Sequence, residues 1–346
     1  MPSAFVFGFI LDSLTLQRID LWFENLVFIV HLFILCVAIF LINAHESERF
    51  FRFLIPQKLV SFLMFVMQFS FGALFSAFFI FYSRSASLAS SWPFLLFLLL
   101  MLFGNEVFRK SYGRLVFQLS LFFIILFSYS IFIVPVVLGK IGVDIFILSG
   151  IVSLVFIGIF IFILSSLIKE KLAKVKSLLT FFILLIFAVF NVFYFTNIIP
   201  PIPLSLKEIG VYHSVLRNKE GGYIAMRENV PWYRVEKLFG SKVHWVSGGS
   251  VYVYSAVFAP TRINTKIYHE WEHYDGKSEE WVTTNKIGFP IVGGRDGGYR
   301  GYTTKESIVS GKWRVNVITE RGQIIGRKTF EVIESDTTPE LEATAF

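Results

Sequence analysis

The chain has 346 residues, of which 55% are hydrophobic, 18% aromatic and only 16% charged, and its formal net charge is +7. This composition is too apolar for an ordinary soluble globular protein and predicts a membrane protein. The positive charge does not indicate a nucleic-acid-binding protein, because acidic residues nearly balance the cations after Pro200 and no basic stripe is formed.

The N-terminal segment contains an apolar stretch, from Ala4 to Leu11, that is too short to cross a bilayer and is ended by Asp12. We expect residues 1–25 to form an interfacial amphipathic helix, with Trp22 near the lipid headgroups. A cleaved signal peptide is not expected, because no basic segment and no small-residue cleavage site precede the first long apolar run.

Six apolar stretches between residues 26 and 199 predict a bundle of six transmembrane helices. A bilayer core requires about 20 apolar residues in helical form, because each backbone amide must be satisfied within its own segment. The third stretch is the shortest and carries Pro93 near its start, where a first helical turn tolerates proline. The predicted spans are Leu26–Asn43, Leu59–Tyr82, Leu88–Phe103, Leu115–Leu138, Val143–Ile168 and Leu178–Ile199.

The distribution of Lys and Arg predicts the orientation of these spans. Three cations, Arg18, Arg84 and Lys140, lie on one side. Because short basic loops stay in the cytoplasm, the N-terminus and everything after Ile199 are expected outside it. The connections after spans one, three and five carry the other ten cations, which are Arg49, Arg52, Lys58, Arg109, Lys110, Arg114, Lys169, Lys171, Lys174 and Lys176.

Ionisable groups are scarce within the spans, and His31 is the clear exception. Transporters and proton pumps usually keep charged groups in their spans. For His31, a neutral imidazole that hydrogen-bonds between helices is favoured over a proton relay, because the sequence shows no relay partner. We therefore expect a bundle that anchors or assembles, with transport or lipid handling as the alternative.

The sequence after Pro200 is rich in short aromatic and β-branched segments separated by turns, which predicts an all-β domain resembling an immunoglobulin-like sandwich. We expect a proline-containing linker and the start of the exported domain at 200–250, the sandwich at 251–334 and a disordered tail at 335–346. A short helix is expected after Pro231. The sole cysteine, Cys36, lies in the first span, so the exported domain contains no disulfide. The predicted strands are 251–258, 265–274, 279–287, 312–319 and 327–333.

The segment YHEWEHY, from Tyr268 to Tyr274, contains a match to the H-E-x-x-H pattern of zinc proteases. That chemistry needs both histidines on one helical face, whereas this segment is β-branched and aromatic and leads into an Asp-Gly hairpin turn. On a strand, four residues separate His269 from His273 by roughly 13 Å, too far to share one ion. A strand is therefore predicted, and a membrane-tethered zinc metalloprotease is the least favoured function.

The stretch FPIVGGRDGGYRGY, from Phe289 to Tyr302, is predicted to be a long glycine-rich loop that presents aromatic and guanidinium groups. Its glycine spacing fits neither a dinucleotide-binding fingerprint nor a P-loop. We expect no catalytic residue, metal ligand or cofactor. The candidate ligand-binding residues are His269 and Trp271 from the strand, and Arg295, Asp296, Tyr299 and Arg300 from the loop.

Several long segments occur in an order that resembles a known family. They include LTLQRIDLWFENL, PPIPLSLKEIGVYHSV, YSAVFAP, HEWEHYD and GKWRVNVITERGQIIG. The chain resembles bacterial membrane proteins that end in domain of unknown function 2914. The resemblance implies a multi-pass protein of the bacterial inner membrane with a small β-rich C-terminal domain, and no established activity. The loop charges predict that this domain is periplasmic. The hypothesis favoured here is a non-enzymatic protein that binds an envelope partner, either a protein or a saccharide.

Overall fold

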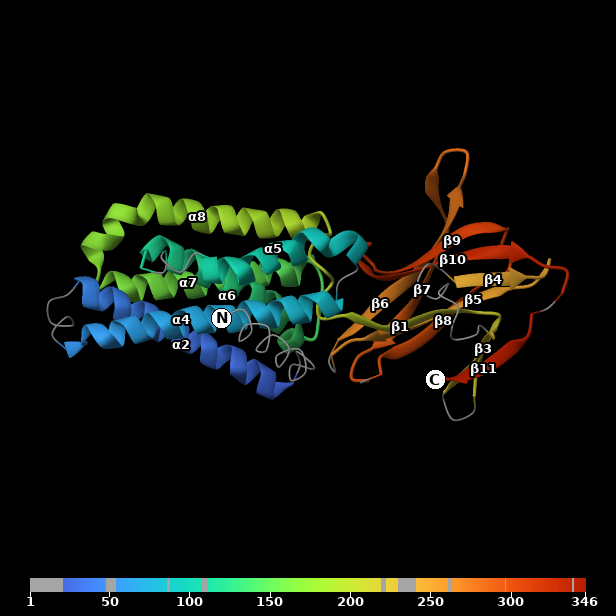
Figure 1. Cartoon of the computed structure of the whole chain (residues 1–346), viewed down its shortest axis with the longest axis horizontal. Helices are drawn as coiled ribbons and strands as arrows, with labels where there is room; N and C mark the ends of the chain where they lie inside the picture. Colours follow the sequence, from blue (N-terminus) through green and yellow to red (C-terminus); the bar gives the residue numbers. More distant parts are fainter. Residues whose placement is uncertain are drawn as a thin grey trace. The chain divides into compact units, whose positions relative to one another are not determined.

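The computed structural model describes residues 21–47, 54–85, 88–107, 111, 113–218, 222–229, 241–260, 263–295, 297–337 and 339–346, with the side chains of 88–90 and 106 excepted. The chain divides at Pro203 and Leu204 into a helical unit and a strand-rich unit (Figure 1). Most of the expected interfacial helix at 1–25, and the short helix expected after Pro231, lie outside these described residues.

The helical unit contains helices at all six predicted spans. Five of them are long and apolar enough to cross a membrane, whereas the apolar part of α5 is a shorter segment, Ser91–Asn105. The last helix begins earlier than expected, so the predicted basic loop at 169–176 is its first two turns. The helices are α2 (Trp22–Ser47), α4 (Gln57–Ser85), α5 (Leu88–Val107), α6 (Leu115–Leu138), α7 (Val143–Ser165) and α8 (Lys169–Phe195).

Aromatic packing fills the inside of the bundle, while large apolar side chains also cover its outside. Phe127 of α6 stacks on Phe146 of α7 and on Phe190 of α8, with ring centroids 5.8 and 4.7 Å apart. On the outer surface Phe162 is 77% exposed, and many other large apolar residues are exposed with it. Such an apolar exterior is unfavourable in water and typical of a surface that faces lipid.

Several polar side chains in the bundle form hydrogen bonds between helices. The Asn43 amide of α2 donates to Gln118 Oε1 of α6 at 2.6 Å, and Lys171 Nζ of α8 donates to Asn43 Oδ1 at 2.8 Å. His31 Nδ1 lies 3.3 Å from Ser70 Oγ, which joins α2 to α4 as predicted. These contacts link α2 to three other helices through groups that are costly to bury unpaired.

The described residues of the strand-rich unit form three sheets. The largest has the order β4-β10-β9-β6-β7, and the two smaller ones have the orders β1-β5-β8 and β11-β3-β2. All pairings are antiparallel except that of β4 with β10. The strands are β1 (Ser205–Tyr212), β2 (Ser214–Arg217), β3 (Tyr223–Glu228), β4 (Ser241–Trp245), β5 (Val251–Phe258), β6 (Asn264–Asp275), β7 (Glu280–Val292), β8 (Tyr299–Lys305), β9 (Gly311–Thr319), β10 (Ile324–Glu334) and β11 (Leu341–Ala345).

One apolar cluster joins the five-stranded sheet to the sheet of β1, β5 and β8. Trp271, Trp313 and Phe330 from the first sheet pack with Val251 and Val253 from the second, and all five are buried. Burial of such large side chains stabilises the folded domain by about 1.5–3 kcal/mol for each side chain. This shared core fixes the two sheets against each other.

The structure differs from the predicted loop at 289–302, most of which is strand. β7 continues through Pro290 to Val292, which is compatible with proline because β7 is an edge strand of its sheet. β8 already begins at Tyr299. Gly301 serves close packing, since a Cβ there would meet the Phe289 ring at 2.4 Å.

Strands also occur on both sides of the predicted sandwich. β1 to β4 lie in the stretch expected to be a linker and the start of the domain, and β11 lies in the tail expected to be disordered. β11 pairs with β3 from Leu341 opposite Glu228 to Ala345 opposite Ile224. The apolar side chain of Phe346 packs beside Tyr212 and Tyr254, which explains why the tail is held in place.

Candidate functional site

The HEWEH segment lies on β6, as predicted, and its first histidine is in the core. His269 is completely buried, with Nε2 2.7 Å from Ser255 Oγ and Nδ1 2.9 Å from Thr303 Oγ1. Burial lowers the pKa of His269 to about 3, because the charged imidazolium would lose its hydration. His269 is therefore a neutral side chain that hydrogen-bonds β6 to β5 and β8.

Trp271 and His273 each contact other residues of the domain, and the segment, which the structure describes in full, does not form a metal site. Trp271 is also completely buried, and its Nε1 donates to Thr303 Oγ1 at 3.1 Å. The His273 ring lies 4.8 Å from the Trp313 ring. Within the part of the chain that the structure describes, no three His, Cys, Asp or Glu residues form a group that could hold a metal ion.

The two glutamates of HEWEH lie on the opposite face of the sheet, in a cross-strand ionic network. Arg314 Nε donates to Glu272 Oε2 at 2.5 Å, and Asn316 Nδ2 donates to Glu270 and Glu272 at 3.0 and 2.6 Å. Arg327 Nε donates to Asn316 Oδ1 at 2.6 Å. These carboxylates are engaged in sheet contacts, which accounts for the glutamates of the motif without catalysis.

The predicted loop residues do not share a surface with the HEWEH residues. Arg295 is exposed, and its guanidinium lies 5.2 Å from the centre of the Tyr299 ring. Arg300 lies in β8 opposite Ala256. Asp296 lies outside the described residues. Arg295 and Tyr299 are thus brought together, while His269 and Trp271 point into the core.

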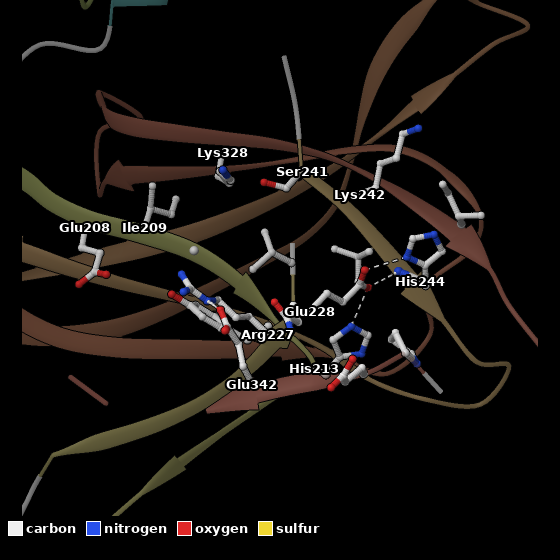
Figure 2. Close-up of a pocket in the computed structure, with 18 residues that line it drawn as sticks. Glu208, Ile209, His213, Arg227, Glu228, Ser241, Lys242, His244, Lys328 and Glu342 are labelled. Carbon is white, nitrogen blue, oxygen red and sulfur yellow. Dashed lines mark hydrogen bonds and ion pairs between the residues drawn. The ribbon is translucent and has the colours of Figure 1, made fainter. Parts of the chain in front are cut away.

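A polar cavity of about 700 Å³ lies elsewhere in the strand-rich unit (Figure 2). Residues 208–213 of β1 and its end, 227–229 at the end of β3 and 241–244 of β4 line it, together with Lys328 of β10 and residues that precede and begin β11. The cavity therefore meets strands from all three sheets. We call it the His–Glu–His pocket, after His213, Glu228 and His244.

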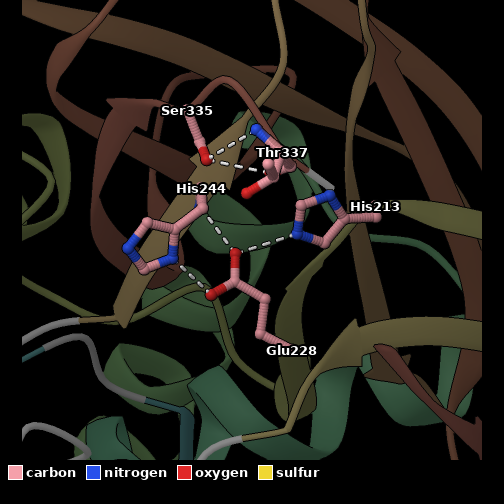
Figure 3. A network of polar contacts seen from close by, with 5 residues as sticks. All are labelled: His213, Glu228, His244, Ser335 and Thr337. Atoms are coloured by element: carbon pink, nitrogen blue, oxygen red, sulfur yellow. Dashed lines mark hydrogen bonds and ion pairs between the residues drawn. The ribbon is translucent and has the colours of Figure 1, made fainter. Parts of the chain in front are cut away.

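Glu228 is hydrogen-bonded to both His213 and His244, as Figure 3 shows. Its Oε1 lies 2.9 Å from His213 Nε2 and accepts the backbone N–H of His244 at 2.5 Å, while its Oε2 lies 2.7 Å from His244 Nδ1. An ionised carboxylate can only accept hydrogen bonds, so both ring nitrogens donate to it. Glu228 thereby ties the corner after β1 to β3 and β4.

The electrostatics of Glu228 favour the ionised form. Burial by itself raises the pKa of Glu228, but the hydrogen bonds from His213 and His244 lower it by more, so that the net pKa lies below its ordinary value. The side chain is only 12% exposed. A largely buried carboxylate with three donors is a firmly positioned anion at neutral pH.

Two further cations of the pocket differ in their surroundings. Arg227 Nε donates to Glu342 Oε1 at 2.6 Å, in an ion pair that is largely exposed. Lys328 is half-buried, and burial lowers its pKa. Its ammonium group has no ion-pair or hydrogen-bond partner among the residues that the structure describes. Lys328 is therefore a positive charge of the pocket that could contact a ligand.

None of the pocket residues was predicted as a site residue. His213, Glu228 and His244 are each isolated in the sequence, and no motif spacing connects them. The pairing of β2 with β3 brings His213 near Glu228, and the carboxylate of Glu228 contacts His244 of β4, a strand of another sheet. No strand was predicted around His213 or His244, so the sequence contained no signal for this pocket.

Residues 264–332 match the family model described as a protein of unknown function, DUF2914. This segment is a DUF2914 domain. It runs from β6 into β10, so the DUF2914 domain supplies Lys328 to the pocket, while His213, Glu228 and His244 come from the chain before it. The resemblance seen in the C-terminal part of the sequence is confirmed.

Comparisons with other proteins add little to the DUF2914 match. None of the curated proteins matches the chain. Among solved structures, a β-glucosidase from Listeria innocua in complex with gluconolactone shares 11% identity at a TM-score of 0.20, over 32% of this chain and 16% of that one. The Pseudomonas fluorescens alkylpurine DNA glycosylase AlkC, bound to DNA with an abasic site analog, shares 6% identity at a TM-score of 0.23, over 91% and 99%. Neither likeness is close enough to indicate a fold or a function.

Proposed function

We propose that this protein crosses the bacterial inner membrane several times and presents an extracytoplasmic β-sandwich, immunoglobulin-like in type, that binds an envelope ligand without catalysing a reaction. The observation that carries the proposal is the His–Glu–His pocket, a polar cavity of about 700 Å³ in the strand-rich unit. Cavities of this size with a few well-placed polar groups are typical of ligand sites.

The membrane placement is supported by the helices and by the loop charges. Five helices are long and apolar enough to span, and α5 is proposed as the sixth. Six crossings return the chain to the side from which it started. Ten of the thirteen cations near the spans lie where spans one and two, three and four, and five and six are joined, four of them in the first turns of α8. This bias supports a strand-rich unit on the side opposite the cytoplasm.

The hydrogen bonds of Glu228 support a binding role rather than a catalytic one. A general base needs a lone pair that is directed at a substrate proton. Glu228 instead accepts hydrogen bonds from His213 and from both the side chain and the backbone of His244. This arrangement fixes the walls of the pocket, and it leaves Lys328 available for recognition.

The proposal is tested with the full chain in lipid nanodiscs and a panel of defined envelope saccharide fragments and short peptides. We expect at least one probe to bind, and Glu228→Ala to weaken its binding about tenfold or more, since the pocket loses three hydrogen bonds. Lys277→Gln, in the exposed β6–β7 turn, is the matched control that retains binding. Failure of every probe, or equal binding by the Glu228→Ala variant, would contradict the proposal.

A further inference from the structure

The His–Glu–His pocket lies between the edges of two sheets. β1 is an edge strand of the sheet β1-β5-β8, and β4 is an edge strand of the five-stranded sheet. Within the described ranges, neither strand pairs with another on its outer side. Both line the same cavity, β1 through residues 208–212 and β4 through residues 241–244.

The run of residues with which these strands line the cavity indicates that their backbone edges face it. Successive side chains of a strand point to opposite faces of the sheet, so a cavity over one face is lined by alternate residues. Here the lining residues are consecutive, from Glu208 to His213 and from Ser241 to His244. A consecutive run is expected where the edge of a strand, rather than one face, borders the cavity.

One hydrogen bond supports this orientation directly. The backbone N–H of His244 donates to Glu228 Oε1 at 2.5 Å and so points away from β10, the strand with which β4 pairs. A side-chain carboxylate thus occupies the place that the carbonyl of a neighbouring strand would take. Backbone groups along such an edge are the groups that an added strand recognises.

Lys328 is the positively charged residue that a strand added in the cavity would contact. The pairing of β10 with β4 starts at Phe330 opposite Ser241, so β4 does not cover β10 at Lys328. Lys328 shares the inward face of β10 with Phe330 and Val332, because side chains alternate along a strand. It lines the cavity (Figure 2), and its ammonium group has no partner in the described part of the chain.

We infer that the His–Glu–His pocket binds an extended peptide segment of a partner protein, which pairs with the edge of β1 and places an acidic side chain against Lys328. The inference rests on the proposed binding function and names the class of ligand. Backbone hydrogen bonds supply the affinity for such a segment, and the contact with Lys328 supplies the selectivity. About five residues of extended peptide, near 3.3 Å each, would follow a strand edge of this length.

The test uses three synthetic seven-residue peptides and the full chain in nanodiscs. The first peptide alternates Thr and Val around a central Glu, the second has Gln at the centre, and the third is the first with alternate backbone nitrogens methylated. We expect the Glu peptide to bind, the Gln peptide to bind about tenfold more weakly through loss of a charge-assisted contact, and the methylated peptide not to bind.

Variants of the chain distinguish the contribution of Lys328 to peptide binding from that of the backbone hydrogen bonds. Lys328→Gln is expected to bind the Glu and Gln peptides equally, which removes the tenfold preference while binding itself persists. Lys277→Gln is expected to keep the preference, because Lys277 lies in the exposed β6–β7 turn. Amide exchange of β9, which pairs with β10, verifies that each variant is folded.

Several results would overturn the inference. Equal binding of the Glu and Gln peptides by the unchanged chain would show that Lys328 does not contact the acidic side chain. Undiminished binding of the methylated peptide would show that the peptide does not pair as a strand. Dimers whose formation competes with the peptide would assign the edge to a second copy. If the peptide binds only after residues 230–240 are replaced by a glycine-serine linker, the strand edge is a binding site for this segment of the same chain and not for a partner protein. If saccharide fragments bind in the pocket and no peptide does, the inference fails while the proposed function stands.

Discussion

The carboxylate of Glu228 holds His244 at two points, with Oε1 2.5 Å from its backbone nitrogen and Oε2 2.7 Å from its Nδ1. Glu228 ends β3, and His244 lies on β4, so this contact joins the small sheet of β11, β3 and β2 to the five-stranded sheet. Its loss should loosen β4 before it affects the core around Trp271 and Trp313.

Substitution Glu228→Gln is expected to destabilise the attachment of β4. The amide side chain keeps the shape but loses the negative charge, and charge-assisted hydrogen bonds contribute about 1.5–3 kcal/mol each. Hydrogen exchange of the amides of residues 241–245 should therefore become faster by about tenfold or more. The control Glu342→Gln breaks a largely exposed ion pair with Arg227 and should change exchange little. Unchanged protection of β4 in Glu228→Gln would show that this carboxylate is not the attachment.

Acid should weaken the same contact. The folded pKa of Glu228 lies below the ordinary value of 4.5, so its stabilising contribution is present above that value and is lost as the pH falls through the folded pKa. We expect amide protection at residues 241–245 to decrease below about pH 4.5 in the unchanged chain, with a smaller decrease in Glu228→Gln. Parallel pH profiles for the two chains would contradict this assignment.

His269 predicts a different pH dependence, in a milder range. Its folded pKa of about 3 lies below the unfolded value of 6.5, so protonation favours the unfolded chain as the pH falls below 6.5. Unfolding free energy should decrease by about 2 kcal/mol between pH 7 and pH 5, at 1.36 kcal/mol for each unit below 6.5. Denaturant unfolding followed by tryptophan fluorescence measures this, and His269→Gln should lack the His269 part of the decrease.

The purified protein should contain no stoichiometric zinc. His269 binds Ser255 and Thr303, while the ring of His273 packs on Trp313, so the two imidazoles do not converge on one point. Elemental analysis of the full chain, with a His273→Ala variant for comparison, measures the metal content. One zinc ion per chain that disappears in the variant would restore the protease hypothesis.

Asn43 should be important for the helical bundle. It is completely buried and connects α2 to Gln118 of α6 and Lys171 of α8. Asn43→Leu removes both contacts, and a loss of about 1–2 kcal/mol is expected, as for interhelical hydrogen bonds in membranes. Thermal aggregation of the detergent-solubilised chain should shift to lower temperature. Ile147→Leu, at an exposed position of α7, is the control that should leave it unchanged.

The helices and several strands were predictable because their patterns are local. Apolar stretches of bilayer length give α2, α4, α6, α7 and α8. β5 was predicted at its observed bounds because aromatic and β-branched residues fill most of it. The strand at HEWEH followed from its composition and from the Asp275 turn, whose carboxylate accepts hydrogen bonds from Lys277 and Ser278.

The early strands and the pocket depend on pairing between distant segments. β11 is short and polar, and it is ordered through β3, more than a hundred residues earlier in the chain. Glu228 of β3 meets His244 of β4 across two different sheets, a contact that no local pattern indicates. His269 and Trp271 were predicted to bind a ligand, but both are buried in the core. Large aromatic rings are common in ligand sites and in cores, so residue type alone does not distinguish the two.

The most direct test of the account is the side of the membrane on which the strand-rich unit lies, because the proposed ligand belongs to the envelope. Alkaline phosphatase and green fluorescent protein are fused separately after Phe346 in a bacterial host. The account predicts phosphatase activity and no fluorescence, since alkaline phosphatase is active only outside the cytoplasm. A fluorescent fusion with inactive phosphatase would place the His–Glu–His pocket in the cytoplasm and contradict the central claim.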